Sequence, residues 1–382
     1  MDETQYRPTL LPTDLVFYER TKESAPHGGN QGIRISRGVY LPEKAFEGLT
    51  HHWQAEHLVA QARIFAEALR PGAYFENRAM TMSSALILYG IDTWVRNPPV
   101  TYRPAEAPGR MSFLPEVQTP LGPVEETVSR PLVFARRKAV PESRKRRASA
   151  LTASGAAPEK TEKREVVLEP LEQVALDIAR RMPPLAATAD VSAIFNRLAK
   201  FDRERPGPSR QREESVRNAL LEMNSNLPTK HRCRIAEAVL EAADAGVDSH
   251  AEGALRWVVL SVVDSDLLHR WFNDKLTSQH EVRVGIERFY LDMALPRLRV
   301  ALEFEGMAKL SANGADPGFK VREYFARRDA LMRAGWRYIA VTYGELFNPV
   351  ALAMRLQDEL GRLKVPVLSD ISAVETGLPR AA

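Results

Sequence analysis

Hydrophobic and polar residues follow two different periods in the first third of the chain. Residues 33–42 alternate as a strand does, whereas residues 51–70 place apolar side chains three and four positions apart, as an amphipathic helix does. A second short helix is expected at residues 81–91. Residues 1–135 are therefore predicted to form a mixed α/β region.

The pattern is lost in residues 136–166 and returns after them with a helical period. Residues 136–166 contain two basic clusters and almost no side chain that could be buried, so we predict a flexible linker. Its basic clusters could instead contact nucleic-acid phosphate. Residues 167–247 are predicted to form a helical middle region, because apolar residues recur there at three- and four-residue intervals.

The remaining pattern predicts a helix, two strands, a helix, a strand and a last helix. The two strands flank residues 296–297, a spacing short enough for an antiparallel hairpin. The strand, helix and strand that follow predict a parallel pair with a right-handed connection. Residues 248–370 are thus predicted to be a compact α/β (α+β) domain with a mixed sheet flanked by helices, and residues 371–382 a disordered tail.

Length and composition limit the classes of protein that need to be considered. A chain of 382 residues suggests two or three domains. Its one cysteine, Cys233, excludes an intramolecular disulfide and a C-x-x-C zinc site. We find neither a secretory signal nor a run of about 18 apolar residues, so we expect a cytoplasmic protein with no membrane segment. The net charge of +4 indicates a polyanionic partner only weakly.

Three carboxylates interrupt the two apolar strands of the predicted hairpin. Glu303 and Glu305 are two residues apart and project from the same face of a strand, and Asp292 lies on the partner strand. Convergent carboxylates repel each other, and a hard cation such as Mg²⁺ or Mn²⁺ relieves this repulsion. A cation of this kind supports attack on a phosphate by activating water and stabilising charge. The alternative is a solvated face of the sheet, on which these acids have no chemical role.

The helix after these strands is rich in arginine. Arg328 falls within its apolar arc, so we expect a partner for it among the acids or a bound phosphate. The apolar residues of this arc are Val321, Tyr324, Phe325, Leu331 and Met332.

The acidic strands and the helix carry a resemblance to a known family. Residues 290–306, YLDMALPRLRVALEFEG, and residues 327–346, RRDALMRAGWRYIAVTYGEL, resemble the carboxy-terminal domain of actinobacterial very-short-patch-repair endonuclease-like proteins, a branch of the PD-(D/E)XK nucleases. The likeness covers about a third of the chain. Residues 36–42, 81–91 and 170–182 also stand in the order of the AbiEi-like antitoxin module that often precedes this domain.

The resemblance implies a role for each acid. Asp292 and Glu303 correspond to metal ligands for Mg²⁺ (or Mn²⁺), and Glu305 occupies the third motif position, also as a ligand. Glu252 corresponds to the acid on the first helix, although Ser249 and Glu252 also match a capping box that explains Glu252 structurally. DNA contacts are expected from the basic residues nearby, which are Lys309, Lys320, Arg322, Arg327 and Arg328.

Three departures from the family pattern leave two functions open. Glu305 replaces the usual lysine, a histidine after the strand is absent with Lys309 nearby, and Ala340 stands where an arginine is frequent. The first function is a metal-dependent DNA endonuclease in DNA repair or phage defence. The alternative is a non-catalytic AbiEi-like antitoxin or transcriptional regulator with a decayed nuclease fold, which would bind DNA and a toxin partner.

Overall fold

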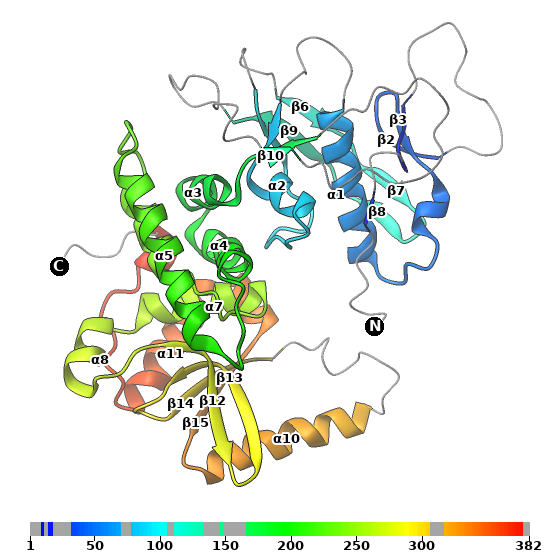
Figure 1. Ribbon diagram of the computed structural model, residues 1–382. Helices are drawn as coiled ribbons and strands as arrows, with labels where there is room; N and C mark the ends of the chain where they lie inside the picture. Colours follow the sequence, from blue (N-terminus) through cyan, green and yellow to red (C-terminus); the bar gives the residue numbers. More distant parts are fainter. Residues whose placement is uncertain are drawn as a thin grey trace, which may run out of the picture. The chain divides into compact units, whose positions relative to one another are not determined.

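The computed structural model divides the chain into two compact units, Met1–Val174 and Ala175–Ala382. Both contain helices and β-structure, which confirms the predicted mixed α/β class (Figure 1). The structure describes residues 9–10, 14–17, 32–69, 78–104, 111–132, 146–147, 166–305 and 317–376. Among these residues, no helix is both long and apolar enough to cross a membrane.

In its described residues, the first unit combines helices with three sheets of two, three and six strands. Its helices are η3 (Glu43–Phe46), α1 (His52–Ala68) and α2 (Met82–Leu88). Its strands are β1 (Val16–Phe17), β2 (Ile33–Ser36), β3 (Val39–Leu41), β4 (Ala79–Met80), β5 (Val100–Arg103), β6 (Ser112–Leu114), β7 (Val117–Thr119), β8 (Gly122–Val124), β9 (Thr127–Pro131), β10 (Arg146–Arg147) and β11 (Val167–Leu168). The sheet orders are β1-β3-β2, β10-β11-β4-β5-β9-β6 and β7-β8.

The predicted elements of the first unit are confirmed, and several strands were not predicted. The strand-like residues 33–42 form β2 and β3, and the two predicted helices are α1 and α2. Most of the predicted linker, residues 136–166, lies outside the described residues. Within it, β10 pairs with β11.

The described part of the second unit places helices around one four-stranded sheet. Its helices are α3 (Leu171–Arg181, which begins in the first unit), α4 (Pro184–Ala199), α5 (Pro206–Ser225), α6 (Cys233–Ala242), α7 (His250–Val262), α8 (Ser265–Phe272), α10 (Pro317–Arg333), η6 (Tyr343–Phe347), α11 (Pro349–Arg362) and α12 (Ala373–Thr376). Its strands are β12 (Thr277–Val284), β13 (Glu287–Leu295), β14 (Val300–Glu305) and β15 (Arg337–Thr342).

The order of this sheet is β12-β13-β14-β15. The first three strands are antiparallel, whereas β14 and β15 are parallel and are joined through α10 (Figure 1). The predicted hairpin and the predicted parallel pair are both confirmed. Strand β12 and helix α8 were not predicted. Strand β12 pairs with β13 over most of its length.

The helical middle region and the sheet belong to the same unit. The predicted boundary between residues 247 and 248 falls inside this unit. Helix α12, with its buried Val374, lies within the segment predicted as a disordered tail.

Helices α4 and α7 pack closely because Gly253 has no side chain. A Cβ atom at Gly253 would lie 2.8 Å from Cα of Ala189. Helix α7 is therefore fixed against the helical region.

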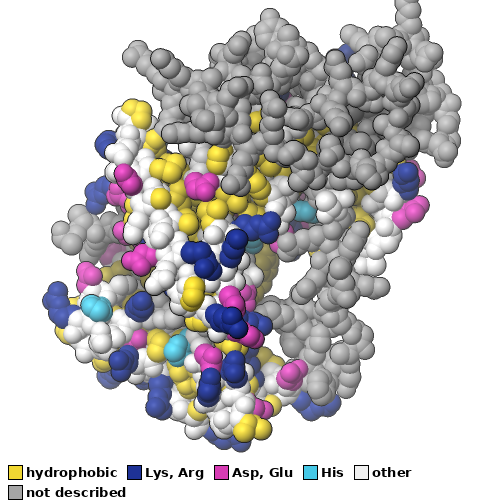
Figure 2. All heavy atoms as spheres, in the orientation of Figure 1, with side chains coloured by type: hydrophobic (Ala, Val, Ile, Leu, Met, Phe, Trp, Pro, Cys, Tyr) yellow, Lys and Arg dark blue, Asp and Glu magenta, His cyan; other side chains and the backbone are white. Residues whose placement is uncertain are grey.

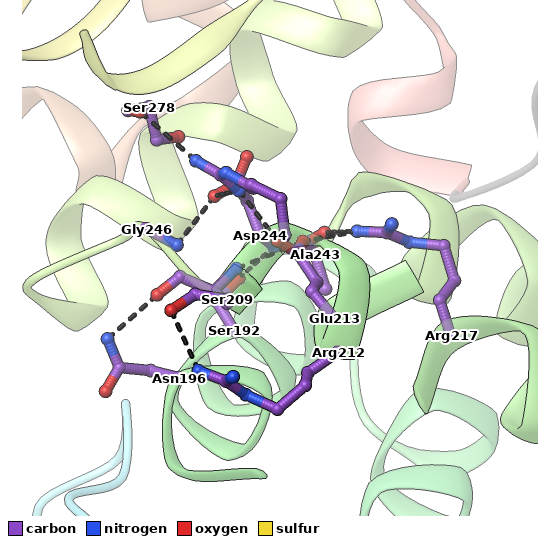
Figure 3. A network of polar contacts seen from close by, with 12 residues as sticks. Ser192, Asn196, Ser209, Arg212, Glu213, Arg217, Ala243, Asp244, Gly246 and Ser278 are labelled. Atoms are coloured by element: carbon purple, nitrogen blue, oxygen red, sulfur yellow. Dashed lines mark hydrogen bonds and ion pairs between the residues drawn. The ribbon is translucent and has the colours of Figure 1, made fainter. Parts of the chain in front are cut away.

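A buried ionic network also joins α5, the segment before α7, α7 itself and β12 (Figure 3). Arg210 contacts Asp244 Oδ1 at 2.6 Å and Glu213 Oε2 at 2.7 Å, and it donates to the backbone oxygen of Ser278 at 3.2 Å. Burial alone would raise the pKa of Asp244, but the charges of Arg256 and Arg210 outweigh this effect and lower it. The network thus favours the ionised form of Asp244 and connects α7 to the sheet.

Candidate functional site

Asp292 and Glu303 face each other where the pairing of β13 with β14 ends. The last backbone pair is Met293 with Leu302, so the next position places Asp292 opposite Glu303. The backbone N–H of Asp292 donates to Glu303 Oε1 at 3.1 Å, and the backbone N–H of Phe304 donates to Asp292 Oδ2 at 2.8 Å. Each carboxylate therefore accepts a backbone hydrogen bond from the other strand, and the two acids lie close together.

Glu303 is also paired with an arginine of α10. Arg327 Nη2 lies 2.8 Å from Glu303 Oε2 and donates to the backbone oxygen of Tyr290 at 2.6 Å. Glu303 is only 4% exposed, so this pair compensates a charge that would otherwise be buried alone. Arg327, which the sequence analysis assigned to DNA, thus contacts one of the proposed metal ligands.

The apolar arc predicted for α10 is wrong for two of its members. Phe325 and Met332 are each 50% exposed, whereas Leu331 is buried. The guanidinium of Arg328 lies over the ring of Tyr338, 5.6 Å from its centroid. Because α10 packs through mixed polar and apolar contacts, hydrophobicity alone could not define its buried face.

Glu305 occupies a different part of the same sheet surface. It accepts a hydrogen bond from the hydroxyl of Tyr324. Partial burial raises the pKa of Glu305, the charge of Arg328 opposes this shift, and the charge of Glu345 adds to it. The structure thus groups Glu305 with residues of α10 and η6, whereas Asp292 and Glu303 contact each other.

Glu303 and Glu305 nevertheless both affect the pKa of the same residue, Tyr338. Burial raises the pKa of this phenol, and the charges of Glu303 and Glu305 raise it further. Both carboxylates therefore act on one group of β15, as expected for residues two apart on a strand. The Tyr338 hydroxyl lies 3.4 Å from that of Tyr324, which continues the polar contacts toward α10.

Glu252 takes part in the predicted capping box of α7 and lies within electrostatic range of Asp292. Ser249 Oγ accepts from the backbone N–H of Glu252 at 3.2 Å, which confirms Ser249 as the N-cap of α7. The Glu252 carboxylate accepts from the backbone N–H of Asp248 at 3.0 Å and from the Ser249 hydroxyl at 2.9 Å. Burial and the charge of Asp292 raise the pKa of Glu252 to about 7. Glu252 therefore belongs electrostatically to the acidic pair.

The carboxylates of Glu252, Asp292 and Glu303 suit a divalent cation only in part. Among the described residues, no group of three or more His, Cys, Asp or Glu side chains is arranged to hold a metal ion. Mg²⁺ and Mn²⁺ prefer carboxylate oxygens, and a cation would relieve the repulsion between Glu252 and Asp292. Full use of Glu303 would require Arg327 to leave Glu303 Oε2.

The other predicted DNA-binding residues lie on α10 or beyond the described residues. Lys309 lies outside them, and of Lys320 only the backbone, within α10, is described. Arg322 is an exposed residue of α10.

Sequence reasoning missed two residues around the acids, Tyr290 and Gln279. Tyr290 precedes Asp292 by two residues and shares its face of β13, a relationship that the strand period could have revealed. Gln279 lies between the Ser278–Met293 and His280–Leu291 pairs, and hence beside Asp292. It is buried and has a φ of 52°, which is unusual for a residue other than glycine. No local sequence signal announces this conformation.

Comparison with known proteins gives no significant match: no family model, no curated protein and no solved structure matches the chain. The resemblance to the very-short-patch-repair endonuclease-like family therefore stays a prediction, as does the AbiEi-like assignment of the upstream segments.

Proposed function

We propose that the carboxy-terminal part of the second unit, residues 248–370, is a restriction-endonuclease-like domain that hydrolyses DNA phosphodiester bonds with a divalent cation. The observation that carries this proposal is the contact between Asp292 and Glu303, with Glu252 in electrostatic range of Asp292. The order α7, β13, β14, α10 also agrees with the order that the family resemblance implies. The enzyme would be of the very-short-patch-repair type and act in DNA repair or phage defence.

In this proposal Asp292 and Glu303 hold Mg²⁺ or Mn²⁺, and Glu252 lies beside them. The bound cation would activate water and stabilise the charge that develops on the phosphate. Glu305, at the position of the usual lysine, would complete the acidic surface while Tyr324 orients its carboxylate. Arg327, once released from Glu303, could bind a DNA phosphate through its planar guanidinium.

Cleavage of supercoiled plasmid tests the proposal with isosteric variants. Wild-type protein with Mg²⁺ or Mn²⁺ should nick the plasmid, and EDTA should abolish nicking. Asp292→Asn and Glu303→Gln should also abolish it, because each removes a cation ligand while keeping side-chain volume. Glu359→Gln on α11 is the matched control and should cleave as wild type does. Full cleavage by both site variants would exclude the proposed ligands.

One observation favours a second function, a non-catalytic DNA-binding regulator with a toxin partner. Glu303 is paired with Arg327 and Glu305 is hydrogen-bonded to Tyr324, so both acids have protein partners that require no cation. This function predicts salt-sensitive DNA binding, no cleavage under any of the above conditions, and a melting temperature that Mg²⁺ does not change. Metal-dependent nicking that Glu303→Gln abolishes would exclude it.

A further inference from the structure

Tyr290 is surrounded by three arginines from separate parts of the second unit. The guanidinium of Arg203 lies 5.3 Å from the centroid of the Tyr290 ring. Arg288 Nη1 lies 3.4 Å from the Tyr290 hydroxyl, and Arg327 donates to the Tyr290 backbone oxygen at 2.6 Å. Arg203 belongs to the loop between α4 and α5, Arg288 to β13 and Arg327 to α10. Three elements therefore bring positive charge to one residue, Arg203 and Arg288 to its side chain and Arg327 to its backbone oxygen.

This cluster lies directly beside the acidic pair. Tyr290 and Asp292 are two residues apart on β13, so their side chains share a face and their Cα atoms are about 7 Å apart. Arg327 joins the two sites, because the same Nη2 atom contacts the Tyr290 backbone oxygen and Glu303 Oε2. A polyanion held by the arginines would pass next to Asp292 and Glu303.

The two outer arginines are exposed and only loosely paired. The side chains of Arg203 and Arg288 are 55% and 49% exposed. Their acidic neighbours, Asp248 and Glu281, each lie 3.8 Å away, and Glu281 makes a closer contact of 2.6 Å with Arg283. Exposed ion pairs at such distances contribute little, so a phosphate can replace these carboxylates. Figure 2 shows basic side chains interspersed with acidic ones over this unit.

We propose that Arg203 and Arg288, placed around Tyr290, bind a backbone phosphate of nucleic acid next to Asp292. The inference rests on the proposed function for the identity of the polyanion. Guanidinium groups bind phosphate through charge-assisted hydrogen bonds, and a tyrosine ring flanked by arginine is a surface on which a base can stack. The α4–α5 loop, which lies outside the segments that resemble the nuclease family, thus takes part in binding the substrate.

Fluorescence anisotropy of a labelled DNA oligonucleotide in EDTA tests this inference separately from cleavage. The Arg203→Ala/Arg288→Ala protein should bind at least tenfold more weakly at low salt. Its slope of log affinity against log salt should be shallower by about 1 to 2, since each lost phosphate contact changes the slope by about 0.9. Arg203→Ala alone should show part of both effects.

The matched control is Arg270→Ala/Arg362→Ala, which removes the same charge from exposed positions on α8 and α11. This control should bind DNA as wild type does, and thermal melting should show that all variants fold. Equal affinity and slope in the Arg203→Ala/Arg288→Ala protein and the wild type would overturn the inference. The inference would also be overturned if the wild type did not bind DNA. It would be overturned likewise if polyglutamate displaced the labelled DNA as effectively as unlabelled DNA does.

The outcome is distinguishable from that of the cleavage assay. Loss of DNA binding in the Arg203→Ala/Arg288→Ala protein, with no cleavage by wild type, would support the phosphate site and reject the endonuclease. Cleavage by wild type with unchanged binding in this variant would support the endonuclease and reject the phosphate site.

Discussion

The carboxylate of Glu303 accepts a hydrogen bond from the backbone N–H of Asp292, 3.1 Å away on the neighbouring strand. Asp292 in turn accepts one from the backbone N–H of Phe304 at 2.8 Å. The two acids that would hold a cation therefore also join β13 to β14 beyond their last backbone pair. Substitutions at these positions change both the structure and the chemistry, so isosteric variants are needed to separate the two effects.

Removal of the Arg327 guanidinium should destabilise the second unit. Arg327→Met leaves the buried charge of Glu303 without its partner, at a cost of about 2 kcal/mol in the free energy of unfolding, given that Arg327 itself is partly exposed. Urea denaturation measures this loss. Arg333→Met, at an exposed position of the same helix, should change the stability by about 0.5 kcal/mol or less.

A second variant tests the origin of that loss. Adding Glu303→Gln to Arg327→Met removes the uncompensated charge and should recover a substantial part of the stability. In the endonuclease proposal, Mg²⁺ should also stabilise Arg327→Met more than wild type, because the cation then meets no competitor for Glu303. Identical stability of wild type and Arg327→Met would show that the ion pair contributes nothing.

Glu252 should make the stability of the protein depend on pH between about 4.5 and 7. Its pKa in the folded state is raised from 4.5 to about 7, so the folded state binds the proton more tightly than the unfolded state does. The resulting stabilisation is fully present below pH 4.5 and is lost as the pH rises through 7. It amounts to about 3 kcal/mol at most.

Glu252→Gln is the variant that tests this titration, because it keeps the side-chain volume and cannot ionise. The wild type should therefore lose stability relative to Glu252→Gln as the pH rises from 4.5 to 7.5. Urea denaturation at a series of pH values measures this difference. A difference that is constant across the range would contradict the raised pKa.

Loss of the Ser249 cap should affect both stability and this titration. Ser249→Ala removes the acceptor for the backbone N–H of Glu252 and a donor to its carboxylate, at a cost of about 1 kcal/mol. Asp264→Ala removes the corresponding cap of α8, whose side chain accepts from the backbone N–H of Leu267 at 2.9 Å. Both variants should lose similar stability, but only Ser249→Ala should raise the pKa of Glu252.

Two glycine substitutions should have opposite effects on stability. Gly253→Ala places a methyl group 2.8 Å from Cα of Ala189, so it should destabilise the protein by about 1–3 kcal/mol despite the better helix propensity of alanine. Gly207→Ala in α5 meets no atom within 4 Å and should stabilise the protein by about 0.5 kcal/mol. Thermal or urea unfolding compares the two. A neutral Gly253→Ala would show that α4 and α7 can separate at little cost.

Local signals in the sequence predicted much of the second unit. The short gap at residues 296–297 predicted the β13–β14 hairpin. Gly335, with a φ of 83°, follows the end of α10, where glycine commonly ends a helix. Ser249 was predicted correctly as the cap at the start of α7. Strand β12 was missed because its polar residues, such as His280 and Glu281, weaken the alternation on which strand prediction relies.

The sequence by itself determined which acids lie on adjacent strands, because a period of two and a short turn place Asp292 near Glu303. It also determined that Glu252 lies in the first turn of a capped helix. Only the tertiary structure decided that α7 brings Glu252 within range of Asp292, that Arg327 rather than Arg328 pairs with Glu303, and that Arg203 reaches Tyr290. Such contacts depend on how the helices are rotated and packed against the sheet. The packing is set by close approaches such as that of Gly253 to Ala189, and no local sequence pattern encodes these approaches.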